Sequence, residues 1–305
     1  MLPTRDDVER ARATIGARLP RTPLLPSRTL GAQLKCELFQ RTGSFKARGA
    51  LNKISSLSAD EKRGGVIAIS AGNHAQAVAY AAAAEDIDAL VVMWQGTSAL
   101  KIEATRGYGA TVDLEATGPA AAFERLAELQ AETGRALVHP FEDPFVLAGA
   151  GTVGLEIEED TPDVDAVIVP VGGGGLISGI QTAIGHRTRV IAVEPETSVA
   201  LHAGIEQGAP TPVTPTSIAD GLNAPFIGAL PLQICAQLER VLVTEQEIES
   251  AFRFLYERTK LACEPAGAVA TAAWLSGKIQ AERPVVLVSG GNVATETAAA
   301  ILARR

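Results

Sequence analysis

The chain has 305 residues, of which 47% are hydrophobic, 20% are charged and 4% are aromatic, and its formal net charge is −8. This composition excludes a disordered chain and allows a sizeable core in one large domain or two coupled ones. The acidic balance argues against a protein that binds nucleic acid or anionic membranes, because both ligands need a basic surface.

Three cysteines (Cys36, Cys235 and Cys263) are widely spaced and odd in number. They predict neither a disulfide framework nor a cysteine-rich zinc site, and they indicate a reducing cytoplasm. The first residues contain no apolar run, and no segment has about 18 consecutive apolar residues. We therefore expect a cytoplasmic protein without a signal peptide or a membrane span.

Short β-branched runs alternate with alanine-rich stretches along the chain. The predicted strands are 66–70, 89–93, 111–114, 166–170, 190–193, 241–244 and 285–289, and the predicted helices are 74–85, 119–132, 245–259 and 267–276. Nearly continuous apolar strands are typical of parallel strands that are buried on both faces. The alternation therefore predicts an α/β fold with mostly parallel sheets, whose ligands bind at the carboxyl ends of the strands.

Four glycines, Gly172, Gly173, Gly174 and Gly175, follow the predicted strand 166–170 and precede a helical stretch. Without Cβ atoms, successive backbone N–H groups can converge on one anion, and the helix N-terminus adds a favourable dipole. The loop therefore predicts a phosphate site. It lacks the Gly-Lys-Ser/Thr of a Walker A motif and fits a dinucleotide fingerprint poorly, with Glu194 about 20 residues later as the only support.

Lys46 stands in the segment GSFK, 43–46, at the start of a predicted helix. The dipole at a helix N-terminus disfavours the cationic form of a lysine, which favours a role as nucleophile or base. A solvated surface lysine is the alternative interpretation of this residue taken alone.

Two further polar segments follow predicted strands. The segment SAGNH, 70–74, opens a helix and predicts a second anion cradle, suited to a carboxylate, and SGGN, 289–292, follows the last strand. Capping and turn geometry are the alternative explanations for each segment. A phosphate cradle, a lysine, a carboxylate cradle and a serine at strand ends together indicate pyridoxal 5′-phosphate (PLP) with an amino-acid substrate.

Eight ordered segments resemble the serine/threonine dehydratase and serine racemase family of PLP enzymes. They are KCELFQRTGSFKARGAL (35–51), SAGNHAQAVA (70–79), FEDPFVLAGAGTVGLEI (141–157), VPVGGGGLISGI (169–180), VEP (193–195), IADGL (218–222), CEPAGAVA (263–270) and SGGN (289–292). The resemblance implies a tryptophan-synthase-β-like fold (PLP fold type II) with two open α/β domains. A large discontinuous domain would comprise 1–55 and 139–305, and a small mobile domain 56–138.

The resemblance also implies roles for individual residues. Lys46 would carry PLP covalently, with Phe45 packed against the ring. The other implied cofactor residues are Asn73 at the 3′ oxygen, Gly172, Gly173, Gly174, Gly175 and Leu176 at the phosphate, and Ser289 at the pyridine nitrogen. The implied substrate-carboxylate residues are Ser70, Ala71, Gly72, Asn73 and His74.

The implied activity is the β-elimination of L-threonine or L-serine to 2-oxobutyrate or pyruvate and ammonia. The substrate amine would displace Lys46, which would then take the Cα proton while PLP delocalises the charge. A serine at the pyridine nitrogen supplies no full counter-charge, which favours prompt loss of the β-hydroxyl. Alternatives are a serine racemase, a dehydratase for another 3-hydroxy amino acid such as 3-hydroxyaspartate, a non-catalytic amino-acid-binding homologue and a nicotinamide-dependent oxidoreductase.

Two positions depart from the family pattern. Ala71 stands where racemases of the family have a serine, so its side chain offers no proton on that face of the substrate. At the candidate metal site Glu194 is present, but Ala200 replaces the aspartate of metal-dependent relatives. One carboxylate offers few ligands for Mg²⁺ or Ca²⁺, which prefer several oxygen atoms, and a monovalent cation or water is the alternative occupant of the site. We also expect a homodimer.

Overall fold

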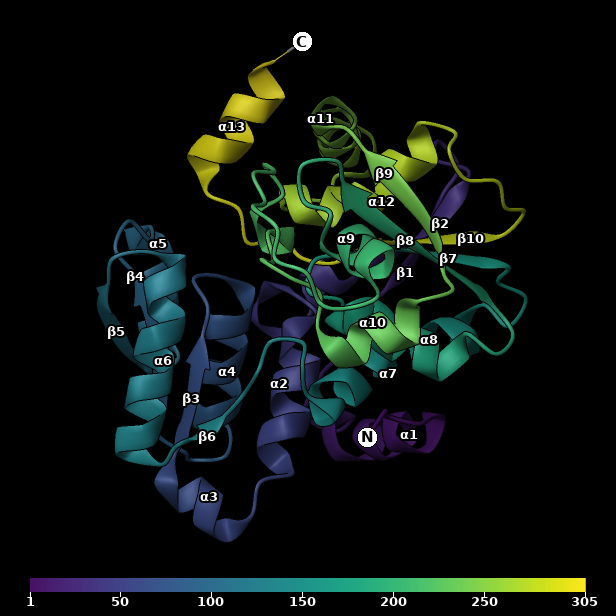
Figure 1. Ribbon diagram of the computed structural model, residues 1–305. Helices are drawn as coiled ribbons and strands as arrows, with labels where there is room; N and C mark the ends of the chain where they lie inside the picture. The colour runs from purple at the N-terminus through teal and green to yellow at the C-terminus, as the bar shows by residue number, and fades with distance from the viewer. Residues whose placement is uncertain (305) are drawn as a thin grey trace.

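A computed structural model of the protein describes residues 1–304. It contains two open sheets (Figure 1), a six-stranded sheet of order β1-β2-β10-β7-β8-β9 and a four-stranded sheet of order β5-β4-β3-β6. Only the β1–β2 pair is antiparallel among the described strand pairs. The predicted α/β class with mostly parallel sheets is therefore confirmed.

The strands of the large sheet come from both ends of the chain. They are β1 (Leu24–Ser27), β2 (Ala32–Cys36), β7 (Ala166–Pro170), β8 (Arg189–Pro195), β9 (Glu239–Val243) and β10 (Pro284–Val288). The small sheet lies between them in sequence and consists of β3 (Val66–Ile69), β4 (Ala89–Trp94), β5 (Thr111–Ala116) and β6 (Ala136–Leu137). This arrangement fits a discontinuous large domain, whose expected limits at 55 and 139, like the mobility of the small one, stay predictions.

Helices cover the sheets. They are α1 (Arg5–Ile15), α2 (Lys46–Ser55), α3 (Ala59–Gly64), α4 (Asn73–Ala83), α5 (Ala99–Gly107), α6 (Pro119–Thr133), α7 (Pro144–Asp160), α8 (Gly175–Ile184), α9 (Ala200–Gln207), α10 (Ala229–Cys235), α11 (Glu245–Phe254), α12 (Pro265–Leu275) and α13 (Thr295–Ala303). In Figure 1, α4, α5 and α6 lie with the small sheet and α2 stands between the two sheets.

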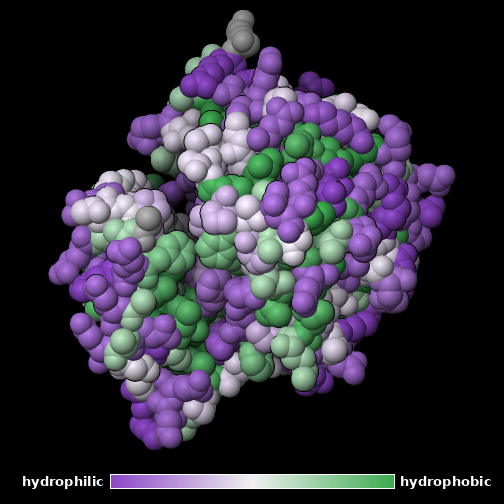
Figure 2. Space-filling view, viewed as in Figure 1, coloured by the Kyte–Doolittle hydropathy of each residue, from purple (hydrophilic) through white to green (hydrophobic). Residues whose placement is uncertain are grey.

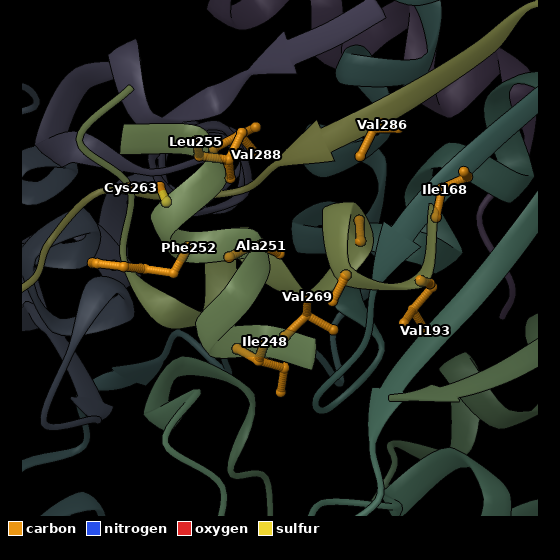
Figure 3. Packing of buried hydrophobic residues seen from close by; sticks show 14 of the residues in the cluster. Ile168, Val193, Ile248, Ala251, Phe252, Leu255, Cys263, Val269, Val286 and Val288 are labelled. Atoms are coloured by element: carbon orange, nitrogen blue, oxygen red, sulfur yellow. The ribbon is translucent and has the colours of Figure 1, made fainter. Parts of the chain in front are cut away.

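The large sheet is buried on both faces because its strands alternate between two cores. Val286 and Val288 of β10 pack in one cluster with residues of α11 and α12, such as Phe252 (Figure 3). Val285 and Leu287 of the same strand pack in the other cluster, with residues of α8. A strand with no solvent face has no polar positions, which explains the continuous apolar runs.

All seven predicted strands are present, 166–170 with unchanged bounds and the other six with one or both ends shifted by one or two residues, but β1, β2 and β6 were not predicted. The sequence of β2, AQLKC, carries Gln33 and Lys35, which interrupt an apolar run, and β6 has only two residues. The predicted helix 245–259 ends as an α-helix at Phe254 and continues as a π turn, Leu255–Thr259.

No helix within residues 1–304 combines the length and the apolar content that crossing a membrane would require. The three cysteines are free and buried. Figure 2 shows a largely hydrophilic surface with a notch between the lobe that carries α5 and β4 and the lobe that carries α13. The small-sheet and large-sheet parts are thus separated by an opening on this face.

Candidate active site

Lys46 is fixed beside the end of β10. The residue before it, Phe45, donates its backbone N–H to the carbonyl oxygen of Ser289 at 3.2 Å, and Ser44 forms an isolated β-bridge with Gly290. The helix α2 then begins at Lys46 itself. Segments that lie more than 240 residues apart therefore bring Phe45, Lys46 and Ser289 together, and their proposed contacts with PLP stay predictions.

The amino group of Lys46 lies in a site whose burial lowers its pKa. Its Nζ donates to the carbonyl oxygen of Pro140 at 3.0 Å and lies 5.1 Å from the centroid of the Phe45 ring. Burial lowers the pKa of Lys46 to about 8. Burial, and then the Lys46 charge, also lower the pKa of His74 to about 3 and that of His139 to about 4, so both imidazoles are neutral.

Sequence reasoning missed Pro140 and His139. Pro140 acts through its backbone oxygen, which no side-chain pattern signals. The Nδ1 atom of His139 accepts the N–H groups of Phe141 (3.3 Å) and Glu142 (2.8 Å), which leaves the ring proton on Nε2. The imidazole therefore shapes the loop that carries the Lys46 acceptor.

A buried ion cluster fixes the first turn of α2. Arg48, only 2% exposed, binds Glu37 at 2.8 Å and Glu156 at 2.7 Å, and Lys35 binds Glu156 at 2.6 Å. Two positive and two negative charges neutralise one another away from water, and losing one partner from such a cluster typically costs about 3–5 kcal/mol. The cluster ties the helix that carries Lys46 to β2 and α7.

The glycine loop is shaped by three neighbouring segments. A Cβ atom on Gly172 would lie 2.9 Å from the Cα atom of Leu222, and one on Gly173 would lie 2.1 Å from the Phe141 ring. Gly174 has φ +90°, and its Cβ atom would lie 2.5 Å from Pro231. These contacts leave no room for side chains, while the N-terminus of α8 has no side-chain cap.

The loop can therefore hold a phosphate through backbone N–H groups alone. Leu176 is 3% exposed, and its side chain lies in the core cluster beside α8. Only the backbone of Leu176 is thus available for the phosphate contact that was predicted.

The predicted carboxylate cradle is one short turn between β3 and α4. Ser70 accepts the N–H of Gly72 through its Oγ atom at 3.1 Å. The side chain of His74 is buried, and its Nε2 atom donates to the carbonyl oxygen of Val138 at 2.8 Å. The structure thus places these residues in one turn, with the His74 ring used to anchor α4, and the proposed contacts to a substrate stay predictions.

Asn73 lies at the centre of a polar cluster that joins the two sheets. Its Nδ2 atom donates to Oε1 of Glu264 at 2.7 Å, and its Oδ1 atom accepts from Nδ2 of Asn292 at 2.8 Å. Burial, and then the charge of Asp220, raise the pKa of Glu264 to about 8. Glu264 and Asn292 lie in the recognised segments CEPAGAVA and SGGN, but the sequence alone assigned them no role.

Comparison with known proteins shows the family of this chain. Residues 17–291 match the family model of the pyridoxal-phosphate dependent enzymes. The chain belongs to this family. Its cofactor is therefore PLP, as predicted.

Curated relatives and solved structures resemble this PLP enzyme over most of its length. It is 43% identical to the L-threonine ammonia-lyase of Thermotoga maritima over 95% of this chain and 76% of the relative. It is 44% identical to the catabolic L-threonine dehydratase TdcB of Staphylococcus aureus over 94% of this chain and 88% of the relative.

Among solved structures, maize serine racemase has a TM-score of 0.91 at 34% identity, covering 97% of this chain and 96% of that chain. The threonine deaminase of T.th. has a TM-score of 0.90 at 39% identity, covering 96% and 99%. These likenesses confirm PLP fold type II.

The residues present fit PLP. The buried amine of Lys46 has a lowered pKa, and an uncapped helix follows a loop whose glycines are required by close packing. The Asn73 amide keeps one N–H beyond the one given to Glu264. The hydroxyl of Ser44, two residues before Lys46, is buried without a hydrogen-bond partner in the described chain. A nucleophilic amine and hydrogen-bond donors are thus present in the segments that the resemblance assigned to the cofactor.

The candidate metal residue does not fit a divalent cation. Glu194 is fully buried, and its Oε1 atom accepts the N–H of Leu201 at 2.7 Å. Its Oε2 atom accepts the N–H of His202 at 3.1 Å and contacts Nδ1 of His202 at 2.5 Å. No group of three or more His, Cys, Asp or Glu residues within 1–304 could hold a metal ion. The carboxylate caps α9, which begins at Ala200.

Proposed function

We propose that this PLP enzyme is an L-threonine and L-serine ammonia-lyase, which converts its substrate to 2-oxobutyrate or pyruvate and ammonia. The observation that carries the proposal is the identity of 43–44% over 94–95% of the chain to relatives named for threonine deamination. The elimination releases water and an enamine, and hydrolysis of the enamine consumes one water and yields the 2-oxo acid and ammonia.

Lys46 is the catalytic residue of this proposal. When bound, PLP supplies an electron-accepting ring that stabilises negative charge at the substrate Cα. A lysine with a pKa near 8 is uncharged in a useful fraction near neutral pH, so Lys46 can attach the cofactor and later accept the Cα proton. The carbonyl oxygen of Pro140 holds the Nζ atom in place, because a carbonyl accepts a hydrogen bond without giving a proton.

Two helix N-termini bind the charged ends of the ligands in this proposal. The loop of Gly172 to Gly175 and the first turn of α8 hold the cofactor phosphate. The turn of residues 70–74 and the first turn of α4, which has no side-chain cap, hold the substrate carboxylate. In this proposal the Gly72 N–H gives up its hydrogen bond to the Ser70 hydroxyl and donates to the substrate carboxylate instead. The Ser70 hydroxyl and the carboxylate therefore compete for this N–H.

Racemisation is the first alternative, because maize serine racemase and a PLP-dependent aspartate racemase share the fold with TM-scores of 0.91 and 0.90. A racemase needs a proton-transfer group on each face of Cα. Lys46 supplies one face, while Ala71 carries only a methyl group where racemases of this family have serine. The residue present at 71 therefore favours elimination.

The test is a product assay of the PLP-loaded enzyme with L-threonine, L-serine, D-serine and 3-hydroxyaspartate. We expect 2-oxobutyrate and pyruvate from the L-amino acids, and no product from Lys46→Ala. Faster release of oxaloacetate from 3-hydroxyaspartate than of 2-oxo acid from either L-amino acid would replace this substrate assignment with the other dehydratase. The cytoplasmic location, the homodimer and the limits of the two domains stay predictions.

A further inference from the structure

We propose that Asn292 is a positioning residue that determines which end of the Asn73 side-chain amide faces the PLP ring. Asn292 and Glu264 hold the two ends of that amide, so that one N–H of Asn73 is directed to an acceptor on the cofactor. The proposal rests on the proposed role of Asn73 at the 3′ oxygen and deepens that site.

The orientation of Asn292 follows from a backbone oxygen. The Nδ2 atom of Asn292 lies 2.7 Å from the carbonyl oxygen of Thr42, which can only accept a hydrogen bond. The NH₂ end of Asn292 must therefore face Thr42. Its second N–H points to the Asn73 side chain at 2.8 Å, where it requires an acceptor. Both donors of Asn292 are thus committed.

The orientation of Asn73 follows in turn. Because Asn292 donates, the atom of Asn73 that faces it must be Oδ1, and the NH₂ end faces Oε1 of Glu264 at 2.7 Å. The opposite rotamer would place the NH₂ groups of Asn73 and Asn292 together, so the hydrogen bond between these two side chains would be lost. Each lost hydrogen bond of this kind costs roughly 1–3 kcal/mol when its partner stays buried. Within residues 1–304 the second N–H of Asn73 has no hydrogen-bond acceptor.

Two glycines make room for this relay of Thr42, Asn292, Asn73 and Glu264. A Cβ atom on Gly43 would lie 2.5 Å from Oδ1 of Asn292, and one on Gly290 would lie 2.4 Å from Oε1 of Glu264. Gly43 belongs to the segment GSFK and Gly290 to SGGN, so both motifs carry a glycine where a relay side chain passes. The relay accounts for these two glycines without any contact to a phosphate.

The relay presents a donor before the cofactor arrives. The 3′ oxygen of PLP is a phenolic oxygen that accepts hydrogen bonds as an anion, so an N–H of Asn73 stabilises it and an amide oxygen in the same place repels it. A donor that is already oriented costs no rearrangement on binding. Asn292 acts only through Asn73 in this proposal, so its effects must vanish when Asn73 has no amide.

The experiment compares Asn292→Ala, Asn292→Asp, Asn73→Ala and the double variant Asn73→Ala with Asn292→Ala. The Kd of PLP and the visible absorption spectrum are measured by adding PLP to each apoprotein, without substrate. Asn52→Ala is the control, because the Asn52 side chain, like that of the half-buried Asn292, donates to a backbone oxygen, that of Phe145 at 2.8 Å, but lies outside the relay.

We expect Asn292→Ala to raise the Kd about tenfold, the equivalent of about 1.4 kcal/mol, and to shift the visible band. Asn292→Asp keeps the shape but offers only acceptors, so Asn73 turns its NH₂ end toward it and the band shifts further. The double variant binds PLP as Asn73→Ala does, because coupled residues are not additive. Asn52→Ala leaves the band unchanged.

A wild-type-like Kd and band in Asn292→Asp, or additive losses in the double variant, would overturn the proposal. Because Asn292→Asp is nearly isosteric, it remains informative if Asn292→Ala fails to fold. Neither readout depends on turnover. An enzyme that binds PLP with these dependences but releases no 2-oxo acid would contradict the proposed ammonia-lyase activity and leave the relay standing.

Discussion

The Nζ atom of Lys46 donates a 3.0 Å hydrogen bond to the carbonyl oxygen of Pro140, which lies 94 residues further along the chain. Lys46 begins α2 and Pro140 lies in the segment that returns from β6 to α7. The contact therefore places the amine where the chain passes between its two sheets. A neutral acceptor holds the amine there without raising its pKa as a carboxylate would.

Lys46 should be the only lysine that PLP labels after borohydride reduction. Lys35 is committed to Glu156 in the buried cluster and Lys53 binds Asp143 at 2.8 Å, whereas Lys46 faces a neutral carbonyl. Mass spectrometry of the digested protein should find the label on the peptide that contains Lys46. A label on Lys35 or Lys53 would contradict the assignment.

The buried amine should make the stability of the PLP-free protein depend on alkaline pH. The unfolded chain keeps the lysine proton up to about pH 10.4, while the folded protein loses it near pH 8. The buried amine therefore lowers the free energy of unfolding by its full amount below pH 8. This loss of stability disappears as the pH rises toward 10.4.

Urea unfolding of wild-type and Lys46→Met apoproteins should show the variant to be more stable at pH 7, with a gap that narrows between pH 8 and 10. Lys53→Met is the control, because Lys53 lies on the same helix but is paired with Asp143. An equal gap at every pH would show that Lys46 is not deprotonated on folding.

Gly174→Ala should destabilise the apoprotein as well as weaken PLP binding. Gly174 has φ +90°, and its Cβ atom would lie 2.5 Å from Pro231 and 2.6 Å from Ile227. Gly208→Ala is the control for the backbone alone, because Gly208 has φ +69° and no atom within 4 Å of its Cβ position. Denaturant unfolding should give a loss above about 1 kcal/mol for Gly174→Ala, larger than for Gly208→Ala. Equal losses would show that the loop relaxes around the new side chain.

Ala71→Ser should raise Cα inversion relative to elimination. The serine hydroxyl would add a proton-transfer group where the wild-type chain has a methyl group, and such groups are worth about 10²–10⁴-fold each. Chiral chromatography and a 2-oxo acid assay on the same L-serine reaction measure the two rates. If the wild-type enzyme forms D-serine as fast as pyruvate, another residue serves the second face.

Removal of divalent cations should leave the enzyme unchanged. Both oxygens of Glu194 already accept hydrogen bonds from the N-terminus of α9 and contact His202, and Ala200 supplies no second carboxylate for a divalent cation. Treatment with a chelator should change neither the melting temperature nor the activity, while Glu194→Ala should lower the melting temperature because α9 loses its cap. A melting temperature that falls with the chelator and recovers with Mg²⁺ would contradict this role of Glu194.

Local sequence predicted the parts of this fold whose patterns are complete within a few residues. The glycine loop after β7 is one case, because a buried strand, four glycines and a helix start are adjacent in the chain. The central strands are another, since burial on both faces forces a continuous apolar run. Strand β2 has no such run. Its Lys35 can be buried because its amine binds Glu156, 121 residues away, and the carbonyl oxygen of Thr22.

The sequence alone predicted the α/β class, and it placed the candidate PLP lysine, the candidate phosphate loop and the alanine at position 71. Only the tertiary structure decided how the amine of Lys46 is held, which groups Glu194 binds, and which end of the Asn73 amide faces Glu264. Those properties depend on pairs such as Lys46 with Pro140 and Asn73 with Asn292, which are distant in the chain. Hydrogen bonds and burial are set by distances in space, so a residue acquires its pKa and orientation only when the chain has folded around it.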